Sequence, residues 1–178
     1  MLFDIFLGNI FSLFSALCVA ISMLKKRKNN LMHWQAFNSF FGVIADIVLM
    51  ANTAVIIDTL CLVRNTLSYK KLLNKTFVVL FMIASISLGL YVNNLGWIGY
   101  LPILASTEYT LCIYITKNAQ QMRYAAVVNM VLWLIHGICI RAYAGSVVSV
   151  FLIIWTIVQI IRNQKFRLFS YVKGLCKC

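Results

Sequence analysis

Two long stretches without a charged side chain constrain this chain most. Residues 5–24 and 142–161 contain no Asp, Glu, Lys or Arg, and each matches the roughly 20 residues that a helix needs to cross a bilayer. Hydrophobic residues make up 62% of the 178 residues, well above the roughly 45–50% of soluble domains. The sequence therefore predicts an all-α polytopic membrane protein without a sizeable soluble domain. The first stretch has no basic segment before it, so we interpret it as a span and not as a signal peptide.

The apolar segments divide the chain into seven predicted spans. Their approximate bounds are 5–24, 31–50, 52–69, 76–92, 97–116, 122–140 and 146–161. Fourteen of the 16 Lys and Arg residues fall in alternate connections and in the C-terminal segment. Because basic residues favour the cytoplasmic side, we expect the N-terminus outside and the C-terminus in the cytoplasm. We interpret the net charge of +12 as loops that touch anionic lipid headgroups, and not as nucleic-acid binding.

An internal repeat organises these spans. Residues 8–71 align with 99–162 at a constant offset of 91 and without a gap. The offset pairs the first three spans with the last three, so a fourth, linking span is needed for both repeats to enter the membrane from the same side. We predict two parallel three-helix bundles related by an axis along the membrane normal, a 3+1+3 plan. Its parts are a first bundle (1–75), a linking helix (76–93), a second bundle (94–163) and a basic cytoplasmic tail (164–178).

The second half carries short motifs that resemble known membrane proteins. A W-x-x-H-G element occupies 133–137, and with the 3+1+3 plan it resembles the W-x-x-Y-G element of the SWEET and PQ-loop superfamily of small-solute carriers. The bacterial inner-membrane YgjV family is more similar. The matching pieces are Leu101-Pro102, Ser106-Thr107, Met122-Arg123, Trp133-Leu134-Ile135-His136, Gly145-Ser146 and Ile160-Ile161-Arg162. The resemblance implies the fold and the inner membrane, and it assigns no substrate. The Pro-Gln pair of PQ-loop carriers is absent from the first span, and Pro102 has no glutamine beside it.

Ionisable side chains within the spans are candidates for a functional site, because a charge near the bilayer centre costs about 2.5–3.5 kcal/mol. Glu108 lies near the middle of the fifth span, and Asp58 lies a little outside the middle of the third. We expect both to face a cavity, where Glu108 couples transport to protons. Asp46 lies near the outer end of the second span, where we expect it to reach water. Arg64 either snorkels to the interface or forms a buried ion pair.

Polar residues of the sixth and seventh spans extend this site. Helical spacing places Asn129, Trp133 and His136 on one face. The repeat offset pairs Asn129 with an equivalent asparagine in the second span, and Asp58 with a serine in the seventh. The predicted substrate-binding residues are Asn38, Asp58, Glu108, Asn129, Trp133, His136, Ser146 and Ser149. The alternatives are interhelical hydrogen bonds for the asparagines, an interfacial position for Trp133 and a water-facing helix end for His136.

The sequence contains no H-E-x-x-H, G-x-S-x-G or Walker motif, so we expect no enzymatic activity and no cofactor. His33 and His136 lie at opposite membrane faces in the predicted topology, which argues against a shared metal. We hypothesise a carrier of a small polar solute, sugar-like or zwitterionic, embedded in the lipid bilayer. The alternative is a non-transporting membrane protein, such as a sensor, an assembly factor or an immunity-type partner. The small residues of GSVVS at 145–149 offer a packing seam for a homo-oligomer.

Overall fold

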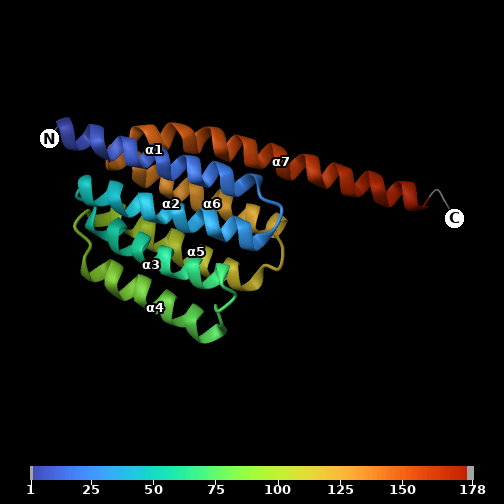
Figure 1. Cartoon of the computed structure of the whole chain (residues 1–178), viewed down its shortest axis with the longest axis horizontal. Coiled ribbons are helices and arrows are strands. Elements are labelled where there is room, and N and C mark those ends of the chain that lie inside the picture. The colour runs from blue at the N-terminus through green and yellow to red at the C-terminus, as the bar shows by residue number, and fades with distance from the viewer. Residues whose placement is uncertain (1, 176–178) are drawn as a thin grey trace.

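The computed structural model describes residues 2–175, with side chains for 3–118 and 120–162. This part of the chain consists of helices joined by short connections. The helices are α1 (Leu2–Leu24), α2 (Lys28–Val48), α3 (Asn52–Tyr69), α4 (Lys75–Tyr91), a short 3₁₀ helix η1 (Gly96–Gly99), α5 (Tyr100–Ile115), α6 (Ala119–Cys139) and α7 (Tyr143–Leu175). The all-α prediction is confirmed, and each predicted span coincides with one α-helix. Helix α7 extends to Leu175, so most of the segment predicted as a tail continues this helix (Figure 1).

Local sequence explains where several helices begin and end. Asn74 and Asn118 precede α4 and α6, and each side-chain oxygen accepts a hydrogen bond from a backbone N–H in the first helical turn, at 2.9 and 3.0 Å. Such caps satisfy donors that the helix itself leaves free. Helices α2 and α6 end two residues before Met50 and Arg141, which adopt left-handed φ angles of 57° and 66°. These residues lie 91 positions apart, so the repeat offset extends to the turn geometry.

The helices pack in chain order, each against the next, and α7 closes the arrangement against α1. Two further contacts join the halves, α2 with α6 and α3 with α5. Figure 1 shows α1, α2 and α3 side by side in front of α7, α6 and α5, with α4 at the edge. The space between the two groups of three helices is therefore the interior of the molecule, and α4 contributes from one side.

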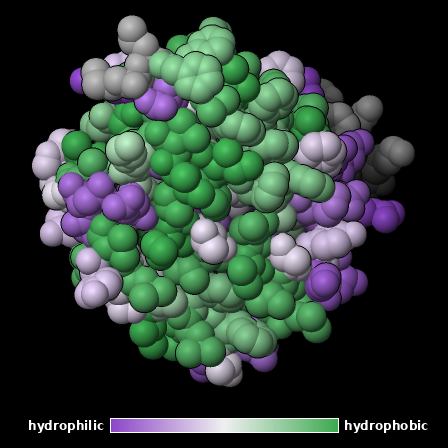
Figure 2. Space-filling view, turned by 60° about the vertical axis from the view of Figure 1, so that its left-hand side comes forward, coloured by the Kyte–Doolittle hydropathy of each residue, from purple (hydrophilic) through white to green (hydrophobic). Residues whose placement is uncertain are grey.

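The outer surface is strongly apolar. Large hydrophobic side chains are exposed on every long helix, including Phe6, Ile47, Ile83 and Phe151. Figure 2 shows hydrophobic side chains across much of one face, with hydrophilic ones gathered mainly toward its margins. A soluble monomer rarely exposes so large an apolar area, whereas a bilayer covers it.

Four segments are long and apolar enough to cross a membrane by length and composition, namely Phe3–Leu24, Gly96–Ile115, Gln120–Cys139 and Tyr143–Arg162. The other three helices differ for identifiable reasons. Helix α4 is apolar but has only 17 residues. Helices α2 and α3 carry polar side chains such as Gln35, Asp58 and Arg64, which lower their hydropathy although these side chains are buried inside the bundle. These three polar residues therefore belong to the interior.

Candidate functional site

A central cavity of about 120 Å³ lies between the two groups of three helices. Helices α1, α2, α3, α5, α6 and α7 all contribute to its wall, together with the α6–α7 turn. The lining residues are Ser12, Ser15, Ala16, Val19, Met23, Gln35, Asn38, Gly42, Ala45, Asp46, Asp58, Tyr109, Ala126, Asn129, Met130, Trp133, His136, Gly137, Ile140, Ala142, Gly145, Ser146 and Ser149. Seven of the eight residues predicted for the substrate site are in this set; the exception is Glu108.

The predicted stripe on α6 faces the cavity. The rings of Trp133 and His136 meet edge to face, with centroids 5.6 Å apart, and Trp133 also packs against the apolar cluster of Ile57, Cys61 and Ile103. His136 is only 1% exposed. The interfacial alternative for Trp133 and the water-facing alternative for His136 are therefore wrong, because both side chains point into the protein.

The two asparagines have equivalent positions in the two halves. Asn38 accepts a 2.7 Å hydrogen bond from the hydroxyl of Ser15, which joins α2 to α1. Asn129 donates a 2.9 Å hydrogen bond to the backbone carbonyl of Ala105, which joins α6 to α5. Each asparagine thus ties the middle helix of its half to the first helix, as the alternative interpretation proposed. Both also line the cavity, so the two interpretations are compatible.

Close helix contacts shape the cavity wall. The carboxylate of Asp58 packs against Gly42, where a Cβ would collide with Oδ2 of Asp58. At Gly145 a Cβ would collide with the hydroxyl of Ser12, so the backbone of α7 lies directly against α1. The GSVVS seam, predicted as a surface for a homo-oligomer, is therefore used at Gly145 for packing within the chain. The hydroxyl of Ser149 donates to the carbonyl of Gly145 at 2.8 Å.

Glu108 does not line the cavity, and the expectation that it faces this space is wrong. Its neighbour Tyr109 takes the cavity-facing position on α5, and one residue along a helix turns the side chain by about 100°. Glu108 lies instead on the stripe shared with Leu104 and Leu111, which are 55% and 43% exposed. Its Oε1 accepts a 3.3 Å hydrogen bond from the thiol of Cys112, one turn further along the helix.

The sequence interpretation also placed Asp46 wrongly. We expected it to reach water at a helix end, but it is 6% exposed and lines the cavity. The repeat indicates this position at the cavity, because the offset of 91 pairs Asp46 with Gly137, which directly follows His136 in the sequence. Ser12, Ser15, Gln35 and Tyr109 are further polar lining residues that the prediction did not include.

Arg64 does not snorkel, and within the described residues it forms no ion pair. Its side chain is 3% exposed, and Nη1 donates to the hydroxyl of Thr110 at 2.7 Å and to the carbonyl of Ser106 at 3.2 Å. Nε and Nη2 donate to the side-chain oxygen of Asn65. The guanidinium lies over the ring of Tyr109, 5.4 Å from its centroid. Neutral oxygens and an aromatic face thus hold this charge between α3 and α5.

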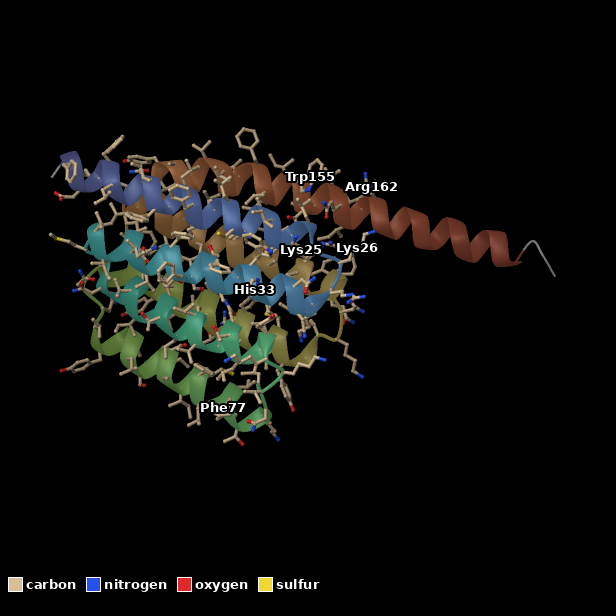
Figure 3. All side chains as sticks on the ribbon, in the orientation of Figure 1. Lys25, Lys26, His33, Phe77, Trp155 and Arg162 are labelled. Atoms are coloured by element: carbon tan, nitrogen blue, oxygen red, sulfur yellow. The ribbon has the colours of Figure 1, made fainter. Side chains whose placement is uncertain are left out.

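One end of the bundle is markedly basic. In Figure 3, Lys25, Lys26 and Arg162 lie at the end from which α7 extends, opposite the N-terminus. We call this the basic end. Two cations here join the halves: Lys28 of α2 donates to the carbonyls of Ile113 and Thr116 at the end of α5, at 2.5 and 2.8 Å.

The second cation is Arg123 of α6, which donates to the carbonyl of Met23 near the end of α1 at 3.1 Å. A positive charge at a helix C-terminus is favourable because the last carbonyls are free and carry the negative end of the helix dipole.

Between these clamps and the cavity lies an apolar cluster, hereafter the methionine cluster. It consists of Met23, Leu31, Met32, Tyr109, Ile113, Met122, Ala125, Ala126, Met130 and Leu152.

Several buried polar atoms at the cavity have no partner. Among the described residues, Oδ2 of Asp46, the hydroxyl of Tyr109 and both ring nitrogens of His136 make no hydrogen bond. Buried polar groups are normally satisfied, so a cavity lined by such atoms is suited to waters or to a polar ligand. Within the described part of the chain, no three His, Cys, Asp or Glu side chains are placed to hold a metal ion.

Comparison with known proteins adds one match. The model of the Imp-YgjV family, described as a bacterial inner membrane protein, matches residues 6–167. This range includes every residue that lines the central cavity. No curated protein and no solved structure matches the chain.

Proposed function

The chain belongs to the Imp-YgjV family of bacterial inner membrane proteins, and on that premise we propose that it carries a small polar solute across the inner membrane. The observation that supports this most directly is the central cavity. Seven residues singled out within the apolar spans line one cavity. A protein that used these spans only as anchors would have no need to bury Asp46, Asp58 and His136 together, because each costs desolvation energy.

The proposal includes a 3+1+3 architecture with all seven helices spanning the bilayer. Three backbone hydrogen bonds at the end of α2, donated by residues 49, 50 and 51, recur at the end of α6 from residues 140, 141 and 142. Their acceptors also differ by 91 positions. A rotation about the membrane normal that exchanges α1–α3 with α5–α7 accounts for the contacts of α1 with α7 and of α3 with α5.

The two ends of the cavity are closed to different degrees, which fits alternating access. Toward the basic end the methionine cluster and the clamps of Lys28 and Arg123 seal the path. Toward the opposite end, an outer hollow of about 260 Å³ is lined by the α2–α3 and α6–α7 turns and the start of α1. Ile140 lines both spaces. With the basic end in the cytoplasm, this is a conformation closed to the inside.

One observation favours the non-transporting alternative. Pro102 is the only proline of the chain, and it lies in the first turn of α5. A proline in the first turn removes a backbone N–H that has no acceptor within the helix, so it does not kink the helix. A carrier that moves its halves about proline kinks has none to use here, so a sensor, an assembly factor or an immunity-type partner remains the second candidate.

Solute uptake into proteoliposomes separates the two functions. We expect uptake of a small polar solute by the wild-type chain, and its loss in Ser149→Leu, because a leucine there fills part of the cavity. Ser87→Leu is the matched control: Ser87 is exposed on α4, and its hydroxyl donates to the carbonyl four residues earlier at 2.8 Å, as that of Ser149 does. Equal uptake in both variants would exclude this cavity as the solute path, and no uptake by the wild type across sugars, amino acids and amines would exclude the carrier.

A further inference from the structure

Two carboxylates face the central cavity from the same region. Asp46 and Asp58 are 6% and 7% exposed, and both belong to its wall. Asp58 packs against Gly42, and Gly42 lies one helical turn before Asp46 on the same face of α2. The two acids therefore occupy neighbouring positions on one wall of the cavity.

Among the described residues, none that lines the cavity is Lys or Arg. Arg64, which lies on α3 with Asp58, donates its hydrogen bonds to Asn65, Ser106 and Thr110. A buried acid normally has a charged or hydrogen-bonding partner. Oδ2 of Asp46 has no hydrogen-bond partner among the described residues, so a partner from outside the chain fits this position.

The rest of the wall suits a cation with N–H groups. The hydroxyl of Tyr109 and the ring nitrogens of His136 have no partner, and a phenol oxygen and one nitrogen of an imidazole can accept hydrogen bonds. The face of an indole such as Trp133 attracts a cation within about 6 Å of its centroid. A bare metal ion fits less well, because the described residues offer no cluster of three metal-ligating side chains.

The volume sets the size of the occupant. The cavity measures about 120 Å³, whereas an engineered apolar cavity of about 150 Å³ holds benzene, with six carbon atoms. A hexose, with about twelve non-hydrogen atoms, exceeds this space. From these observations we propose that the occupant is a compact organic cation with a protonated amine, held by the carboxylates of Asp46 and Asp58. This inference rests on the proposed function, because it takes the central cavity as the solute site.

Thermal unfolding of the purified full chain, with ethylammonium chloride as the probe, tests the inference. Sodium chloride at the same ionic strength is the salt reference, and sodium acetate and ethanol are the anionic and neutral probes of similar size. We expect ethylammonium alone to raise the midpoint of unfolding. The variants Asp46→Asn and Asp58→Asn should each weaken its binding by about tenfold or more, since each removes a charged partner. Glu108→Gln removes a carboxylate outside the cavity and should bind as the wild type does.

The outcomes distinguish this inference from the carrier function. Ethylammonium binding that is lost in Asp46→Asn, Asp58→Asn and Ser149→Leu supports the cation site, even if proteoliposomes show no uptake and the carrier function fails. Uptake of a neutral solute without ethylammonium binding leaves the carrier and overturns the cation site. Equal binding of ethanol and ethylammonium, or unchanged ethylammonium binding in both Asn variants, overturns it as well. If one Asn variant does not fold, the other and Ser149→Leu still decide.

Discussion

The contact between Gly42 and Asp58 offers a direct test of the cavity wall. In Gly42→Ala the new Cβ would collide with Oδ2 of Asp58 and lie 3.1 Å from its Cγ. Overpacking of this kind costs about 1–3 kcal/mol, while alanine in place of glycine returns about 1 kcal/mol of helix propensity. We therefore expect Gly42→Ala to lower the free energy of unfolding by roughly 0–2 kcal/mol, and to displace the carboxylate.

A second substitution makes the test specific. Asp58→Ser shortens the side chain that the new methyl group meets, and the repeat offers a precedent because Ser149 stands at the equivalent position. In a double-mutant cycle, Gly42→Ala should cost less in the Asp58→Ser background, with a coupling energy of about 1–2 kcal/mol. The free energies come from equilibrium unfolding in mixed micelles of detergent and SDS. Gly89→Ala is the control, because its Cβ would meet Ile103 instead.

Additive effects would refute the reasoning. If the Gly42→Ala and Asp58→Ser costs sum to within about 0.5 kcal/mol, the carboxylate does not lie against Gly42. The same conclusion follows if Asp58→Ser relieves Gly89→Ala as much as it relieves Gly42→Ala. In either case the neighbouring placement of Asp46 and Asp58, and with it the cation site, would lose its geometric basis.

Three further predictions concern other parts of the molecule. Cys139 is exposed beside the outer hollow, so an impermeant maleimide should label it in intact cells and should not label Cys139→Ser at this position; reaction of Cys139 only after the membrane is opened would reverse the topology. Lys28→Met should lower the free energy of unfolding by about 1–2 kcal/mol, while Met at the exposed Lys26 should change it little. Equal effects of the two substitutions would show that the contact of Lys28 with the end of α5 does not stabilise the fold. Glu108→Leu should keep or raise stability in the same SDS titration, because Oε2 of Glu108 is buried without a partner; a loss above about 2 kcal/mol would show that this carboxylate has an important partner.

The helices could be predicted from the sequence because apolar length, basic loops and the repeat all indicate the same boundaries. The turn after α2 shows the limit of this approach. The sequence there offers only a weak polar signal around Asn52, and no glycine marks the left-handed residue, which is Met50. The charge pattern was needed to divide the second predicted span from the third. The continuation of α7 through residues 164–175 had no such signal, because its basic residues indicated a tail.

The site could be predicted where helical spacing and the repeat both applied, as for Asn129, Trp133 and His136. Prediction failed where it rested on depth alone. Glu108 lies near the middle of its helix, but depth does not determine which way a side chain points. The repeat could have corrected this, because the offset pairs Glu108 with Leu17, which is 45% exposed.

The repeat also explains why the two halves contribute different chemistry to one cavity. The offset pairs Gly42 with Trp133 and Asp58 with Ser149. In the first half the smaller side chain is on the middle helix and the larger one on the third. In the second half the larger side chain is on the middle helix and the smaller one on the third. Both acids, Asp46 and Asp58, come from the first half, whereas the rings of Trp133 and His136 come from the second. Two identical subunits would place the same groups on both walls. A fused pair of repeats is free to diverge, and here an acidic wall faces an aromatic one. For the cation proposed above, this arrangement predicts one orientation, with the charge toward α2 and α3.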